Sequence, residues 1–170
     1  QAVQRGLRVR CLVRRAAAAG FLKSLGCELV EGDLDQPESL QRAAAGATVV
    51  VHCAAKVGDW GPTEDYRRVN VEGTRALLDA ALATGSLRRW VQISSLGVYE
   101  GRDHFGTDEA TPPSTVGIDG YTLTKVESEL LVMRYVRERA LPAVVLRPGF
   151  IYGVRDRTVL PRLLERLRSG

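Results

Sequence analysis

The sequence predicts an α/β protein built on a parallel, doubly wound sheet. Strand-like segments alternate with helix-like segments along the chain, which is the pattern of parallel strands joined by crossover helices. Residues 48–52 form an almost continuous apolar run, as expected of a strand covered on both faces. At 170 residues, with no linker or internal repeat, the chain has the length of one domain.

Local signals place the elements in order. Residues 7–13 alternate apolar and polar side chains, and residues 16–25 form an Ala-rich helix that Gly26 closes. Pro37 near the first turn and Gly46 after the last turn bound the next helix. The expected strands are residues 7–13, 27–30, 48–52, 89–93 and 143–146, and the expected helices are residues 16–25, 37–45, 64–83, 120–139 and 158–168.

Composition excludes several classes of protein. Hydrophobic residues make up 45% of the chain and charged residues 26%, which is typical of a globular protein. The net charge of +4 comes from arginines spread over many segments, so no nucleic-acid partner is expected. No apolar run reaches the ~20 residues that cross a bilayer. The three cysteines lack metal-ligand spacing, which favours a reduced, cytoplasmic protein without a metal site.

A feature common to dinucleotide-binding domains is missing. Such a domain opens with a strand and a glycine-rich turn, whereas Gly6, Gly20 and Gly26 are wrongly spaced and follow no apolar strand. We therefore expect a fragment that begins after that turn. Its absent strand would lie between residues 7–13 and 48–52, and the fragment alone would bind cofactor poorly and be inactive.

Tyr121 and Lys125 form the most informative pair of side chains. They lie four residues apart in a predicted helix, and therefore on one face of it. A phenol titrates near ~10 and needs a neighbouring cation before it can act as a base at neutral pH. Bringing the pKa of a phenol to about 7 requires roughly 4 kcal/mol. The sequence thus predicts that Lys125 lowers the pKa of Tyr121 and that the pair performs acid–base chemistry.

Three further stretches accompany this pair. Residues 69–74 read Val-Asn-Val-Glu-Gly-Thr inside a long helix, residues 93–99 end one strand, and residues 146–153 close the next strand. With Tyr121 and Lys125, these stretches resemble the extended short-chain dehydrogenase/reductase superfamily, the NAD-dependent epimerase/dehydratase-like proteins. The resemblance implies a Rossmann-like domain that lacks its first strand and most of its C-terminal substrate domain, with the substrate-binding region starting after about residue 150.

The resemblance also implies catalytic roles. Tyr121 matches the acid/base of the superfamily, and Lys125 matches its partner, which also binds the nicotinamide ribose. Ser95 matches the serine that hydrogen-bonds the substrate oxygen, and Asn70 matches the asparagine whose helix supports the lysine. Two alternatives stay open, because Ser95 could simply terminate a strand and Asn70 could be an ordinary polar residue of a helix.

The cofactor implied by the resemblance is NADP or NAD. Arg14, at the end of a strand that carries no carboxylate there, favours the 2′-phosphate of NADP, although it could also simply face water. Asp33 and Leu34 resemble the contact with the adenine edge, and small residues after residue 52 resemble those that the cofactor passes over. The full set of expected cofactor contacts is Arg14, Asp33, Leu34, Ala54, Ala55, Ser94, Tyr121, Lys125 and Pro148.

The substrate class follows from two stretches. Residues 95–97 carry no carboxylate, which argues against sugar dehydration. Residues 52–61 look like the dihydroflavonol reductase and 3-beta-hydroxysteroid dehydrogenase-like branch, in which Val57 and Trp60 could line a site for a small hydrophobic alcohol or ketone. A nucleotide-sugar epimerase and a non-catalytic NADP-binding regulator are the alternatives. Pairing of two chains through the two long helices is a further expectation.

Overall fold

The computed structural model describes residues 1–58, 60–116, 119–154, 156 and 159–169. Two residues of the sequence analysis lie outside these ranges. They are Asp59, which belongs to the stretch 52–61, and Thr158, which is the expected start of the last helix. The described residues contain five strands, and neighbouring strands pair in parallel, as the alternating pattern predicts. These strands form two sheets rather than the single sheet expected. One sheet pairs β1 (Arg10–Val13) with β2 (Glu28–Glu31), and the other has the order β3 (Val49–His52), β4 (Arg89–Ile93) and β5 (Ala143–Leu146).

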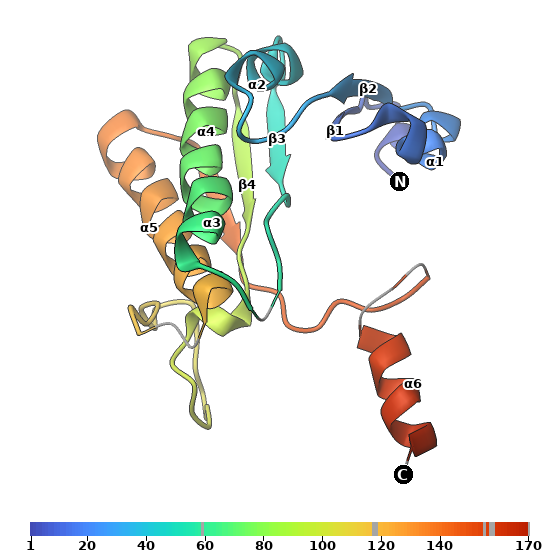
Figure 1. Cartoon of the computed structure of the whole chain (residues 1–170). Helices are drawn as coiled ribbons and strands as arrows, with labels where there is room; N and C mark the ends of the chain where they lie inside the picture. Colours follow the sequence, from blue (N-terminus) through green and yellow to red (C-terminus); the bar gives the residue numbers. More distant parts are fainter. Residues whose placement is uncertain (59, 117–118, 155, 157–158, 170) are drawn as a thin grey trace.

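The helices lie mainly on one side of the larger sheet (Figure 1). Helices α4 (Gly73–Ala83) and α5 (Gly120–Arg139) run side by side over β3, β4 and β5. Helix α3 (Thr63–Arg67) leads into α4, and α2 (Pro37–Ala44) packs against α4 near the smaller sheet. Helix α6 (Val159–Ser169) stands apart from these layers, and no helix in the described part of the chain is long and apolar enough to cross a membrane.

The two sheets are not joined by backbone pairs between β1 and β3 among the residues that the structure describes. This interval is where the sequence predicts a further strand. One of the contacts between the smaller sheet and α2 is made by Arg10, whose Nη1 donates to the carbonyl of Ala45 at 2.6 Å and of Ala43 at 3.2 Å. A cation on the last carbonyls of α2 is favourable, because those groups have no partner within the helix.

Three predicted elements differ in detail from those observed. The strand expected at residues 7–13 begins only at Arg10, because its parallel partner β2 begins at Glu28, opposite Arg10. The helix expected at residues 16–25 is divided into a 3₁₀ turn, Ala16–Ala19, and the short helix α1, Gly20–Ser24. Glycine is a poor helix former, which favours a break at Gly20.

The helix expected at residues 64–83 is continuous but contains a π turn at Arg68–Glu72, between α3 and α4. The amide of Gly73 donates to the carbonyl of Arg68, five residues earlier. Such turns insert one residue into a helix and are frequent at functional sites. The inserted turn carries Asn70.

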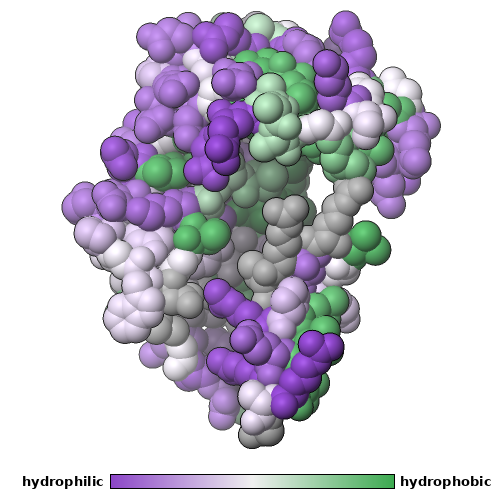
Figure 2. Space-filling model, turned by 45° about the vertical axis from the view of Figure 1, so that its right-hand side comes forward, coloured by the Kyte–Doolittle hydropathy of each residue, from purple (hydrophilic) through white to green (hydrophobic). Residues whose placement is uncertain are grey.

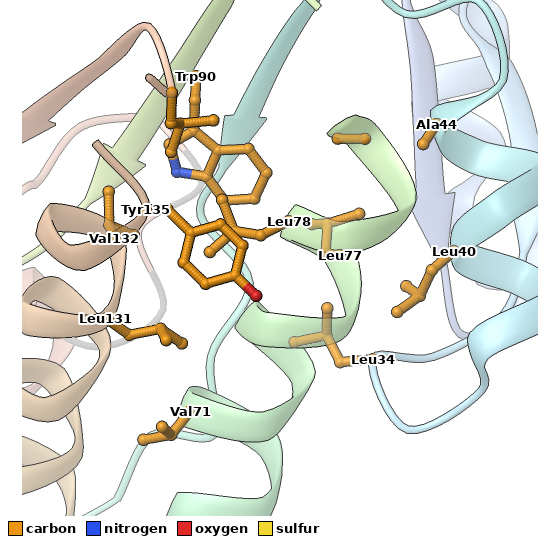
Figure 3. Packing of buried hydrophobic residues seen from close by; sticks show 12 residues of the cluster. Leu34, Leu40, Ala44, Val71, Leu77, Leu78, Trp90, Leu131, Val132 and Tyr135 are labelled. Carbon is orange, nitrogen blue, oxygen red and sulfur yellow. The ribbon is translucent and has the colours of Figure 1, made fainter. Parts of the chain in front are cut away.

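The hydrophobic core lies between the larger sheet and the helices (Figure 3). Trp90 of β4 and Tyr135 of α5 fill its centre, while Leu34 and Leu40 reach toward α4 from the segment around α2. Helix α4 approaches Leu34 closely, since a Cβ added at Gly73 would lie 2.7 Å from the Leu34 Cβ.

The opposite face of the larger sheet has no helix over it in the described part of the chain. Alternate side chains of the outer strands therefore differ in exposure: Val49 and Val51 are 54% and 59% exposed, whereas His52 is buried. Val144 and Leu146 of β5 are exposed as well. Figure 2 shows hydrophobic surface in a hollow near the middle of the molecule, bordered by hydrophilic residues.

Candidate functional site

Side chains that carry chemistry gather at the carboxyl edge of the larger sheet. The segments that follow β3, β4 and β5 meet there with the first turn of α5, at the lower end of the sheet in Figure 1. Open parallel sheets bind their ligands at this edge, because the loops after neighbouring strands converge on it.

Tyr121 and Lys125 lie in the first turns of α5. The helix starts in a capping box, in which the Asp119 carboxylate accepts the amide of Thr122 at 2.7 Å. The Nζ atom of Lys125 lies 5.9 Å from the centre of the Tyr121 ring. It donates to the backbone carbonyl of Ile93 at 2.7 Å, which fixes α5 against the end of β4. The predicted common face is thus confirmed.

The predicted lowering of the Tyr121 pKa is wrong for this structure. Burial raises the pKa of Tyr121, and the nearby Asp119 carboxylate raises it further. Burial also lowers the pKa of Lys125, a change that Cys53 and Glu129 partly oppose. The Lys125 ammonium is engaged by the Ile93 carbonyl rather than by the phenol oxygen, so it does not offset the burial of the ring.

Ser95 lies on a tight turn directly beside α5. Its Oγ accepts the amide of Gly97 at 3.1 Å. A Cβ added at Gly97 would lie 3.2 Å from the Thr122 methyl carbon, so this turn packs against the residue next to Tyr121. The backbone also ties the turn to Pro148, whose carbonyl accepts the amide of Leu96 at 3.0 Å.

Ser94 is directed into the protein instead. It is 4% exposed, and its hydroxyl donates to Oε2 of the buried Glu129 at 2.6 Å. Two adjacent serines thus differ in accessibility, since successive side chains of an extended strand point to opposite faces.

Asn70 connects the segment after β3 with α5. Its Oδ1 accepts the amide of Lys56 at 2.7 Å, and its Nδ2 donates to the Lys56 carbonyl and to the hydroxyl of Thr124. The side chain is 2% exposed, so its contacts are with protein groups next to Lys125. These bonds fix the segment that includes Ala54, which is exposed, and Ala55, which is half-buried.

Tyr66 of α3 holds the next part of the same segment. Its hydroxyl donates to the carbonyls of Trp60 at 2.8 Å and Gly58 at 3.1 Å. Its ring packs against Gly120, where an added Cβ would lie 3.0 Å away. The Trp60 side chain, 93% exposed, is therefore carried by a fixed backbone close to the start of α5.

His52 is a structural residue at the end of β3. It is 4% exposed, and its Nε2 lies 2.8 Å from the Thr74 hydroxyl. Because that hydroxyl donates to the Asn70 carbonyl, it accepts a hydrogen bond from the Nε2–H group of His52. Burial lowers the pKa of His52 to about 4, with a smaller contribution from the charge of Lys125.

A polar cavity of about 260 Å³ lies at the carboxyl ends of β1 and β2. It brings together two of the predicted cofactor residues, Arg14 and Asp33, and its lining consists of Arg14, Glu31, Gly32, Asp33 and Gln36. Gly32 allows the chain to pass over α2, because an added Cβ would lie 2.1 Å from the Ser39 Cβ. Leu34 turns away into the core.

The lining fits the adenosine end of a nicotinamide dinucleotide. The Arg14 guanidinium is exposed, and one Asp33 oxygen accepts the amide of Leu34 at 2.7 Å while the other has no partner among the described residues. An open cation and an acceptor oxygen are the groups that would hold a phosphate or an amine. No group of histidines, cysteines or carboxylates in the described residues could hold a metal ion.

Sequence reasoning missed three residues of these sites. Glu31 lines the same cavity as Arg14 and accepts the amide of Ala16 at 2.9 Å. Its place at the end of β2 could have indicated this, since neighbouring parallel strands end at one edge. Glu129 and Arg147, which pair beneath Ser94, gave no local signal because they lie far apart in the chain.

A parallel α/β sheet with a ligand edge of this kind is the arrangement of a Rossmann-type domain. The sequence matches the family described as "NAD dependent epimerase/dehydratase family" over residues 1–170. The chain belongs to this family. A short-chain dehydrogenase/reductase superfamily protein from Agrobacterium tumefaciens, solved with bound NAD, is similar at a TM-score of 0.73 and 35% identity, over 86% of this chain and 43% of that one.

Curated relatives are named as reductases and dehydrogenases. A 4-hydroxy-2-methyl-3-oxo-4-farnesyl-3,4-dihydroquinoline-1-oxide ketoreductase of Stigmatella aurantiaca is 34% identical over 98% of this chain and 50% of its own length. A 3-beta-hydroxysteroid dehydrogenase of Mycolicibacterium neoaurum is 34% identical over 83% of this chain and 40% of its own length. The chain thus spans half or less of the length of these two relatives.

Proposed function

We propose that this chain forms part of an NAD(P)-dependent oxidoreductase that interconverts a ketone and a secondary alcohol on a small hydrophobic molecule. The single observation that carries the proposal is the arrangement of Tyr121, Lys125 and Ser95. All three belong to segments packed on one another at the carboxyl edge, and Lys125 is locked to the end of β4. This is the edge at which a Rossmann-type domain holds its ligand.

The proposed roles follow from the chemistry of each group. When it is bound, the nicotinamide ring supplies or accepts the hydride. Tyr121 exchanges the proton of the substrate oxygen, and the Ser95 hydroxyl donates a hydrogen bond to that oxygen. At neutral pH a phenol with a raised pKa is in its protonated form, which is the form that ketone reduction requires of Tyr121.

A hydrophobic substrate is supported by the side chains around this edge. Val57, Trp60, Leu96 and Phe150 are all more than half exposed, and they follow three different strands of the larger sheet. Exposed apolar side chains gathered at a ligand edge indicate an apolar partner. The names of the relatives above indicate a farnesylated quinoline and a hydroxysteroid as their substrates, and both are largely apolar molecules.

The test is the replacement of Tyr121 by Phe in the full-length protein. NADPH and NADH oxidation is followed with 3-ketosteroids and 2-alkyl-3-oxoacyl compounds. Loss of the proton donor should lower kcat/KM by about 100- to 10,000-fold. Tyr135→Phe is the matched control, since this buried tyrosine lies further along the same helix, donates to Asp79 of α4, and should be replaceable without loss of activity.

Three outcomes would contradict the proposal. Turnover that survives Tyr121→Phe would remove the phenol from the mechanism. Tight cofactor binding without turnover of any ketone would favour the non-catalytic regulator, and turnover of nucleotide sugars without net cofactor oxidation would favour the epimerase.

We further propose NADP(H) as the preferred cofactor, on the basis of Arg14. Arg14→Gln should weaken NADPH binding by about 10- to 100-fold and leave NADH binding nearly unchanged, because a charged hydrogen bond to the 2′-phosphate is lost. Arg15→Gln, one residue further and outside the cavity lining, is the control. Both affinities are measured by cofactor fluorescence, and equal losses for NADPH and NADH would contradict the assignment.

The expected pairing of two chains stays a prediction. Leu130 and Met133 on the outer side of α5 are 43% and 38% exposed, which supplies apolar area for such a contact. Sedimentation velocity would detect it. The cytoplasmic location also stays a prediction.

A further inference from the structure

We propose that Glu129 and Arg147 form a buried positioning pair, which holds the Ser95 turn and residues 99–111 against the helix that carries Tyr121 and Lys125. The effect of the pair on turnover rests on the proposed function. Its effect on the conformation of these segments does not.

The pair is buried and closely bonded. The Glu129 side chain is 3% exposed and the Arg147 side chain 15%. Arg147 Nη2 lies 2.5 Å from Oε1 of Glu129, and Nε donates to the same oxygen at 3.1 Å. Two donors on one carboxylate set the orientation of both groups, as in a two-pronged arginine–carboxylate contact.

Glu129 extends the attachment of α5 to the end of β4. It lies four residues after Lys125 and therefore on the same helix face. Lys125 bonds the carbonyl of Ile93, and Glu129 accepts the hydroxyl of the next residue, Ser94, at 2.6 Å. Two consecutive residues are thus fixed to α5 immediately before Ser95, so the position of the Ser95 hydroxyl relative to Tyr121 depends on both bonds.

Arg147 connects the same point to the long segment after β4. Its Nη1 donates to the Tyr99 hydroxyl at 2.7 Å and to the Thr111 carbonyl at 3.3 Å. The guanidinium carbon lies 4.9 Å from the centre of the Tyr99 ring. The Tyr99 hydroxyl in turn donates to the carbonyl of Asp108 at 3.0 Å. One guanidinium therefore secures both ends of residues 99–111.

Stability alone is a weak reason for such a pair. The free energy needed to remove two charges from water offsets much of the free energy gained from their attraction. Apolar side chains in the same place are therefore often equally stable. A directional pair does, however, fix one geometry among several. The pair bonds to protein groups on either side of Ser95, namely Ser94, Tyr99 and Thr111, so we assign it a positioning role.

The test compares Glu129→Gln, Arg147→Lys and the double variant Glu129→Gln/Arg147→Gln with Glu127→Gln. Glu127 is the matched control, because it lies on the same helix and forms its own ion pair with Arg67 at 2.8 Å. The double variant leaves no unpaired charge in the interior, so it should fold even if a single variant does not. Arg147→Lys keeps the charge and should retain part of the wild-type behaviour.

Hydrogen exchange of the full-length protein is the readout that needs no turnover. Amides of residues 96–114 should exchange about 10-fold faster or more in the Glu129 and Arg147 variants, while residues 73–83 of α4 keep their protection. In ketone reduction, kcat should fall about 10-fold or more with little change in the Kd of NADPH, since misplacement of catalytic groups is costly.

Uniformly faster exchange along the chain, or an equal effect of Glu127→Gln, would overturn the proposal, because either would indicate a general loss of stability. Unchanged kcat in a variant with faster exchange would overturn the link to catalysis. A wild-type protein that reduces no ketone would refute the proposed function, and the exchange result would still decide whether the pair positions these segments.

Discussion

His52 shows how one side chain joins the sheet to the helices. It ends β3, donates to Thr74 of α4, and lies against Trp90 with the ring centres 5.6 Å apart. The same series of hydrogen bonds includes Ser128, whose hydroxyl also donates to Thr74. It ends at Gln92, whose side-chain amide donates to Ser128. A protonated His52 would place an unpaired charge in this interior, which explains its low pKa.

This low pKa predicts a stability that depends on pH. The folded-state pKa of about 4 lies below the ordinary value of 6.5, so protonation favours the unfolded chain. Neutral His52 makes its full contribution to the free energy of unfolding above about pH 6.5. As the pH falls from 6.5 toward 4, this free energy decreases by at most about 3 kcal/mol. Urea unfolding of wild type and His52→Gln between pH 7 and pH 4 measures the difference. Parallel pH dependence of the two proteins would contradict the prediction.

The sequence indicates which residues share an edge but not which way each side chain turns. Tyr121 and Lys125 could be placed together because helical spacing is fixed. Ser94 and Ser95 are adjacent and chemically identical, and the sequence does not indicate that Ser94 is the one that bonds the buried carboxylate of Glu129. The sequence also predicts the wrong sign for the shift of the Tyr121 pKa. That shift depends on how deeply the fold buries the ring, which helical spacing does not indicate.

At the scale of elements, the π turn decides where Asn70 points. It shifts the helix between α3 and α4 by one residue and directs the Asn70 amide toward Lys56 and Thr124. No propensity in residues 64–83 marks this turn, because it is stabilised by contacts with α5 and the segment after β3. The strands and the longer helices were predictable because their hydrophobic patterns agree with their final burial.

Helix α4 also depends on the close approach at Gly73. Gly73→Ala should lower the free energy of unfolding by about 1–3 kcal/mol, because the added methyl group must displace the Leu34 side chain. Gly20→Ala is the control: it has open space and a helical backbone, so alanine should be neutral or stabilise by up to about 1 kcal/mol. Both are measured by urea unfolding, and equal effects would contradict the packing argument.

At the scale of the molecule, the two regions proposed to bind the cofactor lie on two different sheets, and we call each region a half-site. The cavity beside Arg14 belongs to β1 and β2, whereas Tyr121 and Lys125 face the edge formed by β3, β4 and β5. The parallel direction of all strands could be predicted, and it places both half-sites at carboxyl ends. The separation into two sheets depends on which strands find a partner, and alternating segments alone do not specify that.

We propose that one dinucleotide spans both regions, with its adenosine end beside Arg14 and its nicotinamide end beside Tyr121 and Lys125. A crystal structure of the full-length protein with NADPH tests it most directly. In that structure we expect the 2′-phosphate beside Arg14 and the nicotinamide ring beside Tyr121 and Lys125, with the Ser95 hydroxyl facing the same space. A cofactor bound away from the carboxyl edge, or a Tyr121 hydroxyl directed away from the nicotinamide, would contradict it.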